Sequence, residues 1–341
     1  MSWMRRVKGL FRAKMDQGHS GAGNEPAKLP TGCVLGFGCD KCPGDAGYLV
    51  THECTGLQLI WVPGTKSVSG RSIRGGCFLM GSTPQEIAKQ WKDNGWTWEV
   101  LDYLEQPQHP VELSPFWLSK TEVTNASFER FVTESHYNVE GKWSEYGLQR
   151  YPDHPVVGVT WNDAQAFCNW ANLELPTEAQ WEWAARGPAG NVYPWGDDWN
   201  RVWCNNHELH AGPLPTPEAF DNYIHELNVT AKSGLQGRAL DVADAVKWLR
   251  PVGSFPKDMS WCGAMDMAGN VQEWCSDYFE GHYYRTSPKP NPTGPNTGFD
   301  RAWRGGSYRK VAYFCRSASR GMSFAEDSSS ARGFRPCLRA E

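Results

Sequence analysis

Apolar residues alternate with small or polar ones in three stretches of the first half of the chain, and each stretch predicts one or two short strands. The stretches run from Leu57 to Val62, from Arg74 to Ser82 and from His109 to Thr124. Glycine or proline borders the second and third stretches, which is typical of strands that end in turns. We expect the main domain to begin at the first stretch.

Three helices are predicted next, each by a threonine that stands ahead of apolar residues three and four positions apart. The threonines are Thr124, Thr160 and Thr177. Thr177 also forms a capping-box pattern with Gln180, and Gly187 is placed to end that helix. Each helix is expected to bury one aromatic-rich face.

The chain divides into three parts by composition. Residues 1–31 start with a basic stretch and continue into polar sequence rich in Gly and Pro, so we expect a flexible leader. Residues 32–56 are rich in cysteine, and residues 57–341 form the main domain. The leader lacks the apolar core of a secretory signal, and the eleven cysteines are too scattered for a small secreted domain. The protein is therefore expected to be cytoplasmic, with most thiols reduced and buried.

An insertion at about residues 207–250 interrupts the main domain. The hydrophobic pattern loosens there, although the stretch from Leu240 to Leu249 has helical periodicity of its own. A metal site in this insertion stays an alternative, because the insertion contains three histidines: His207, His210 and His225. The spacing differs from the HExxH pattern of zinc enzymes, and solvated loop histidines are the commoner case.

Composition restricts the partners. The 18 Trp, 35 Gly and 23 Pro residues favour a loop-rich fold packed with aromatic side chains. With 34 basic and 38 acidic residues, the net charge of −4 offers no general attraction to nucleic acid or anionic lipid. No apolar run approaches the roughly 18 residues that span a bilayer. Nucleic acid and membranes are not expected as partners, although a lipid-surface role for the basic N-terminal stretch stays open.

Nine motifs occur in the order found in one known family. They are GGCFLMGS, FWLSKTEVTNASFERFV, HPVVGVTWNDAQAFCNWAN, LPTEAQWEWAARG, YPWGDDW, PVGSFP, MDMAGNVQEW, WRGGSY and GFR. One such motif would be weak evidence, but nine in order over residues 60–341 are specific. By these motifs the chain resembles the formylglycine-generating enzyme (sulfatase-modifying factor) family. The resemblance implies an irregular α+β domain of C-type-lectin-like fold, with little regular secondary structure and two helices packed on a twisted antiparallel sheet.

Enzymes of this family convert a cysteine of a target sulfatase to formylglycine, using two cysteines that bind copper(I). These cysteines follow the GGSY motif and stand five residues apart. Alignment from GGSY places Cys315 and Arg320 on them, and alignment back from GFR places Ala312 and Ser317 there. Neither alignment yields a pair, so the resemblance implies a member without oxidase activity, and copper is not expected. Cys315 then acts as a small buried hydrophobe; the alternative is a single essential thiolate beside an unrecognised metal site.

The resemblance also implies structural calcium. The oxygen ligands of the family's better-kept calcium site fall on four residues here: Asp266, Gly269, Val271 and Glu273. Calcium prefers oxygen ligands and two of these residues carry carboxylates, whereas the alternative is a turn with two solvated acids. A second family site uses an asparagine that matches Asn205, but its other ligands lie in the altered insertion. Gln272 replaces a tryptophan that often stands at this position in the enzymes.

Four cysteines near the N-terminus form a candidate zinc site: Cys33, Cys39, Cys42 and Cys54. They lie within 22 residues, and the middle pair has the CxxC spacing of a tetrahedral zinc knuckle. Disulfides or unliganded thiols are the alternatives, and a reducing compartment argues against disulfides.

The segment between the RGGS and GFR motifs has the frame of many non-enzymatic members. Among them are the variable proteins of diversity-generating retroelements, which mutate positions between the fixed motifs to create new ligand-binding surfaces. The matching positions here are Tyr308, Arg309, Tyr313, Phe314, Ser319 and Phe324. Tyr, Arg and Phe mixed with small residues suit an adaptable binding surface, and the alternative is ordinary loops.

The sequence thus predicts a non-catalytic, calcium-stabilised protein that binds a protein or small-molecule ligand through its C-terminal loops. The main alternative is a metal-dependent oxidase of the formylglycine-generating type that acts on a cysteine or another side chain of a target protein. A third possibility is an accessory domain that holds the cysteine-rich segment in an assembly. The oxidase requires Cys315 to be exposed in a groove, and the binding protein does not.

Overall fold

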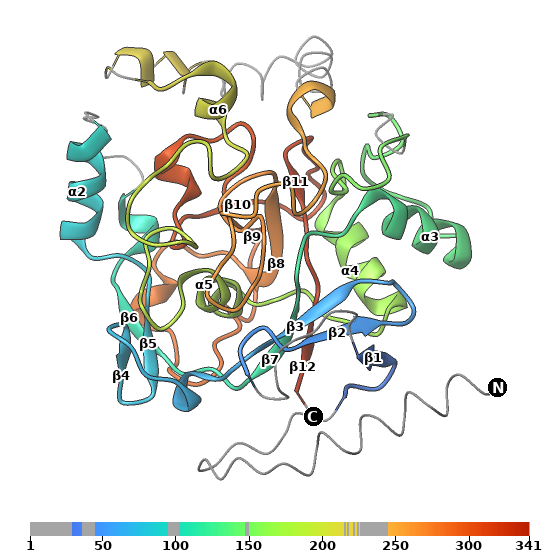
Figure 1. The fold of residues 1–341 in the computed structure, drawn as a ribbon, viewed down its shortest axis with the longest axis horizontal. Coiled ribbons are helices and arrows are strands. Elements are labelled where there is room, and N and C mark those ends of the chain that lie inside the picture. Colours follow the sequence, from blue (N-terminus) through green and yellow to red (C-terminus); the bar gives the residue numbers. More distant parts are fainter. Residues whose placement is uncertain are drawn as a thin grey trace.

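The computed structural model describes residues 29–35, 45–94, 102–146, 150–214, 216, 218–220, 222–223, 225 and 245–340. Short strands and short helices alternate around a central helix, α5 (Glu178–Arg186), which lies between the sheets (Figure 1). This mixed architecture with short elements is the α+β fold predicted from the sequence. In the described part of the chain, no helix is long and apolar enough to cross a membrane.

The largest sheet has five strands in the order β1-β2-β3-β7-β12, all paired antiparallel. The strands are β1 (Cys33–Leu35), β2 (Leu49–His52), β3 (Gln58–Val62), β7 (Phe116–Ser119) and β12 (Cys337–Arg339). β3 confirms the first predicted strand, and β7 lies within the third predicted stretch. β1 and β2 come from the cysteine-rich segment, so this segment extends the sheet of the main domain.

Two smaller sheets complete the strand structure. One has the order β10-β9-β8-β11, in which only the β8–β11 pairing is parallel. Its strands are β8 (Gln272–Tyr278), β9 (Asp300–Arg304), β10 (Arg320–Phe324) and β11 (Arg332–Gly333). The other contains β4 (Ile73–Arg74), β5 (Cys77–Met80) and β6 (His109–Val111). Five short strands, β8 to β12, thus come from the described chain after Pro251.

The three predicted helices are present with their predicted caps. Thr124 caps α3 (Asn125–Ser135), Thr160 caps α4 (Trp161–Trp170), and Thr177 caps α5 through a capping box with Gln180. Two further helices were not predicted as such: α2 (Pro84–Asn94) and the short α6 (His207–Ala211). Of the helical stretch predicted inside the insertion, residues 245–248 are helical, and its start lies outside the described residues.

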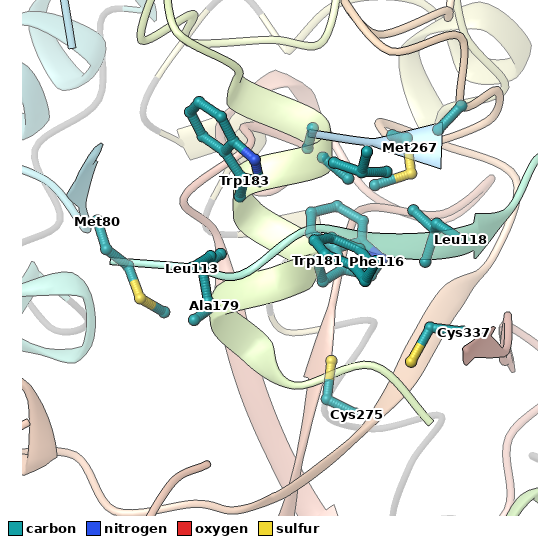
Figure 2. Packing of buried hydrophobic residues seen from close by; sticks show 14 of the residues in the cluster. Met80, Leu113, Phe116, Leu118, Ala179, Trp181, Trp183, Met267, Cys275 and Cys337 are labelled. Carbon is teal, nitrogen blue, oxygen red and sulfur yellow. The ribbon is translucent and has the colours of Figure 1, made fainter. Parts of the chain in front are cut away.

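The centre of the five-stranded sheet is buried on both faces, which explains why β3 and β7 carry few polar residues. Leu59 and Trp61 point to one face, where α3 and α4 pack with Phe128 and Phe167. The alternate side chains of β3 point to the opposite face, where the second core cluster gathers around Trp181 of α5. Figure 2 shows this cluster, with α5 running across β7. The sheet and α5 therefore form a rigid base for the C-terminal loops.

Candidate functional site

The six predicted ligand-binding residues of the C-terminal segment lie in different environments. Tyr308, Tyr313 and Ser319 are buried, and Arg309 and Phe314 are partly buried. The Tyr308 hydroxyl hydrogen-bonds to Ser330 at 3.0 Å. Phe324 is the exposed one of the six, at 56%. Of the six residues, Phe324 is therefore the most accessible to a ligand. The binding role of the other five stays a prediction.

Phe324 belongs to an exposed apolar surface on the β9–β10 hairpin, formed by Phe299, Met322 and Phe324. Their exposed fractions are 90%, 44% and 56%. Phe324 pairs with Asp300, the residue after Phe299, so the two aromatic residues lie near the same end of this strand pair. β10 is also an edge strand, whose outer main-chain groups have no strand beside them in this sheet. We call these three residues the hairpin surface.

Cys315 lies in the interior and has no exposed surface. A second thiol is its neighbour, because Cys204 hydrogen-bonds to it and both belong to a buried cluster with Tyr193 and Ala268. Burial raises the pKa of Cys204 well above the usual thiol value, and the contact with Cys315 adds to this effect. The sequence alignments could not find this pair, since they considered only positions close to Cys315 in the chain.

The predicted calcium ligands are close together, but Glu273 has no free oxygen. Arg335 donates to both of its carboxylate oxygens at 2.6 and 2.7 Å, and Trp181 donates to one of them at 2.8 Å. Gly269 packs directly against the main chain of Asn205, whose side-chain amide donates to Trp248 and Asn270. Val271 is buried in a neighbouring cluster.

Asp266, the other predicted carboxylate ligand, is paired with a second buried acid. Glu122 hydrogen-bonds to Asp266, and one oxygen of each carboxylate has no further partner among the described residues. Burial raises the pKa of both groups, as it does for Asp258 nearby, while the charge of Arg335 opposes the shift. Within the described ranges, no group of three or more His, Cys, Asp or Glu side chains is arranged to hold a metal ion.

Only part of the candidate zinc site can be placed. Cys33 on β1 pairs with His52 on β2, and Cys54 follows shortly after β2. Burial and Glu53 raise the pKa of Cys33 to about 11. Cys39 and Cys42 lie outside the described residues, so the zinc site stays a prediction. The nine described cysteines are free thiols, and eight of them are buried.

The histidines of the insertion do not gather into one site. His210 stacks on Trp248 at 5.2 Å, and burial lowers its pKa to about 4. His207 contacts Tyr223 at 4.8 Å, and burial lowers its pKa as well. Both rings pack against aromatic side chains, and Nε2 of His210 also hydrogen-bonds to Oδ1 of Asn205 at 2.7 Å.

A network of buried arginines and glutamates surrounds α5. Arg304 donates to Glu178 and to Glu182, each at 2.9 Å. Glu178 also accepts from Arg320, and Glu182 accepts from Arg186 at 3.0 Å. Three guanidinium groups thus share two carboxylates. We call these five residues the α5 charge network: Glu178, Glu182, Arg186, Arg304 and Arg320.

A cavity of about 390 Å³ shares Arg186 with the α5 charge network. Its wall also includes Arg316 and Ala318 from the C-terminal segment, and residues of α2 and β4. The charged lining residues comprise five basic and two acidic side chains: Arg71, Arg74, Lys89, Arg186, Arg316, Glu86 and Asp197. Sequence reasoning missed this cavity because its wall joins segments that are far apart in the chain.

The family model described as "Sulfatase-modifying factor enzyme 1-like domain" matches residues 65–340. The chain belongs to this family. A formylglycine-generating enzyme of Streptomyces coelicolor is 36% identical over 276 residues, which cover 68% of this chain and 80% of that protein. The resemblance seen in the sequence motifs is therefore confirmed.

Solved structures support the fold. The structure of PvdO from Pseudomonas aeruginosa matches with a TM-score of 0.60 at 21% identity, over 86% of this chain and 99% of that one. Treponema denticola variable protein 1 matches with a TM-score of 0.54 at 18% identity, over 86% and 97% of the two chains. At these identities the likeness concerns the fold alone.

Proposed function

We propose that this protein is a non-catalytic member of the family that binds a protein partner through the hairpin surface. The observation that carries the proposal is the exposure of Phe299, Met322 and Phe324 on one hairpin. Full burial of one such side chain contributes roughly 1.5–3 kcal/mol, so covering all three gives a useful part of a binding free energy. The edge of β10 can add main-chain hydrogen bonds to a partner strand.

The position of Cys315 supports the non-catalytic part of the proposal. A thiol that oxidises a target side chain must meet that side chain in a groove, and Cys315 is fully buried. The frame of the C-terminal segment, which resembles that of non-enzymatic members, agrees with a binding role. Fold alone does not decide between binding and catalysis.

The test compares partner capture by the wild type and by the double variant Met322→Ser/Phe324→Ser. Both side chains are exposed, so the variant is expected to stay folded. Val202→Ser is the control, because Val202 is 55% exposed and is not one of the residues of the hairpin surface. A protein retained by the wild type and by the control but lost at least tenfold from the double variant, by quantitative mass spectrometry, supports the proposal. Equal retention by all three contradicts it.

The Cys204–Cys315 pair favours one second candidate, an oxidase of the formylglycine-generating type. Two sulfurs in contact are the donor set that copper(I) prefers, so the pair fits this ion. Bound copper(I) would supply the chemistry that activates oxygen. The chain itself supplies the two thiols and a site from which Tyr193 and Ala268 exclude water.

Elemental analysis with thiol titration separates the two functions. For the binding protein, we expect no copper or iron in the purified wild type and no conversion of cysteine to formylglycine in a sulfatase-derived peptide. One copper per chain that is lost in both Cys315→Ser and Cys204→Ser, together with peptide conversion, would make the protein an oxidase.

Calcium is proposed as the structural ion. Asp266 and Glu122 fit it best, because each keeps a carboxylate oxygen without a partner among the described residues. Glu273 fits less well, since Arg335 occupies both of its oxygens. A calcium ion at this place would neutralise two buried acids and tie together the loops that carry them.

A further inference from the structure

We propose that the cavity beside α5 binds a small molecule through a carboxylate or phosphate group, with Arg186 as the residue that holds this group. The cavity wall contains none of the residues of the hairpin surface. The proposal therefore goes beyond the proposed function and does not rest on it. It concerns the class of ligand that this cavity binds.

Arg186 has one unused edge. Its Nη1 donates to the carbonyl oxygens of Leu79 and Gly81 and to Glu182. Neither its Nε nor its Nη2 makes a hydrogen bond to any residue that the structure describes. These two nitrogens form the side-on edge of the guanidinium, which matches two oxygens of a carboxylate or phosphate group.

Two other buried arginines, Arg320 and Arg335, show what this edge binds. Arg320 uses Nε and Nη2 to hold both oxygens of Glu178. Arg335 uses the same two nitrogens to hold Glu273. The same edge of Arg186 meets no protein carboxylate in the described structure, and Arg186 lines a cavity. A buried donor without an acceptor is costly, so an oxyanion from a ligand is the group that would satisfy it.

The charge of the cavity favours an anion. Five basic side chains against two acidic ones give an excess of three positive charges in the lining. Arg71 pairs with Asp197, and Arg316 pairs with Glu105 behind the wall. Arg74 is exposed and has no ion pair within the described ranges. Of the four arginines in the lining, Arg186 and Arg74 are therefore the two that a ligand can use.

The size of the cavity limits the ligand to a small molecule. At about 390 Å³ it lies at the lower end of the range for small-ligand pockets, which run from about 300 to 1,000 Å³. Leu79, Val192 and Ala318 supply apolar surface for the rest of such a molecule. A protein chain or a nucleic acid would not fit.

Calorimetric titration of the full chain with inorganic phosphate and, separately, with succinate tests the proposal at low ionic strength. Saturable binding of phosphate alone assigns a phosphate ligand, and saturable binding of succinate alone assigns a carboxylate ligand. Arg186→Lys keeps the charge but loses the fork, so we expect binding at least about tenfold weaker. Arg74→Glu reverses an exposed charge and is expected to weaken binding about fivefold to tenfold.

Arg130→Glu is the matched control. Arg130 is exposed on α3, which lies across the molecule from α2 in Figure 1, and the substitution changes the net charge by the same amount as Arg74→Glu. This control is expected to bind like the wild type. Failure of the wild type to bind either anion overturns the proposal, as does equal binding by all variants. If circular dichroism shows Arg186→Lys to be unfolded, unchanged binding by Arg74→Glu overturns it alone.

Discussion

The α5 charge network and the acidic cluster around Asp266 are both buried, but they differ in which charge is in excess. Around α5, three arginines share Glu178 and Glu182. In the acidic cluster, Arg335 is the cation that faces four carboxylates: Glu122, Asp258, Asp266 and Glu273. The two sets meet where Glu273 on β8 pairs with Arg304 on β9.

The difference shows what each region lacks. In the α5 charge network, arginines outnumber carboxylates. Both carboxylates accept hydrogen bonds from arginines, and the group left without a partner is the Nε and Nη2 edge of Arg186. In the acidic cluster, burial and the neighbouring acids raise the pKa values of Glu122 and Asp258, burial raises that of Asp266, and the groups left without partners are oxygens of Glu122 and Asp266. The first region therefore suits an anion, and the second suits a cation or a shared proton.

Removal of the central arginine of the α5 charge network is expected to destabilise the fold more than any other change proposed here. Arg304→Met takes one partner from Glu178 and one from Glu182, and leaves both acids buried. We expect the free energy of unfolding to fall by about 3–5 kcal/mol, measured by urea denaturation. Arg130→Met, which removes an exposed pair, should change it by less than about 0.5 kcal/mol. Equal effects would mean that burial does not strengthen the network.

Calcium removal tests the acidic cluster. If calcium binds Glu122 and Asp266, a calcium concentration 100-fold above its Kd adds about 2.7 kcal/mol of stability, which chelation removes. Thermal unfolding with calcium and with chelator measures this difference. Glu122→Gln should lose most of the response to calcium, whereas Glu326→Gln, at an exposed position, should keep it. If thermal unfolding of the wild type does not depend on calcium, the result contradicts the calcium site and favours a proton shared by Glu122 and Asp266.

A smaller effect concerns pH. Asp277 accepts a hydrogen bond from the Glu178 amide at 3.0 Å, and burial together with the charge of Glu178 raises its pKa from 3.8 to about 7. The folded state therefore holds this proton more tightly than the unfolded chain. The contribution of this bound proton to stability is complete below pH 3.8. It is lost as the pH rises from 3.8 to about 7, and the free energy of unfolding falls by up to about 1.4 kcal/mol per pH unit.

The variant Asp277→Asn should flatten this dependence. Its free energy of unfolding, measured by urea denaturation from pH 4 to 8, is expected to fall less between pH 4 and 7 than that of the wild type. Asp198→Asn, which changes an exposed acid, should keep the wild-type slope. A slope for Asp277→Asn equal to that of the wild type would show that Asp277 does not titrate in this window.

Local features of the fold could be predicted from the sequence because their signals are local. Thr177 and Gln180 stand three residues apart, and they form the capping box that starts α5. α2 was missed although it carries the same kind of signal. Thr83 and Glu86 exchange hydrogen bonds at its start, and Pro84 occupies the first helical position.

The sites could be predicted less well because they depend on contacts between distant residues. No spacing rule connects Cys204 with Cys315, or Glu122 with Asp266. Glu273 was a reasonable calcium ligand by its position in the motif, but its hydrogen bonds to Arg335 depend on how β8 and the GFR motif meet in space. The unused edge of Arg186 is visible only when every hydrogen bond of that side chain is known.

The order of the five-stranded sheet has a consequence for synthesis on the ribosome. β3 and β7 can pair early, but the second edge of β7 is covered by β12, which follows nearly the whole domain in the chain. A nascent chain that ends before Cys337 therefore exposes one edge of Phe116–Ser119, an apolar strand open to wrong pairing. Translation of β12 closes this edge. A factor that protects β7 during synthesis is therefore needed only until β12 has been made.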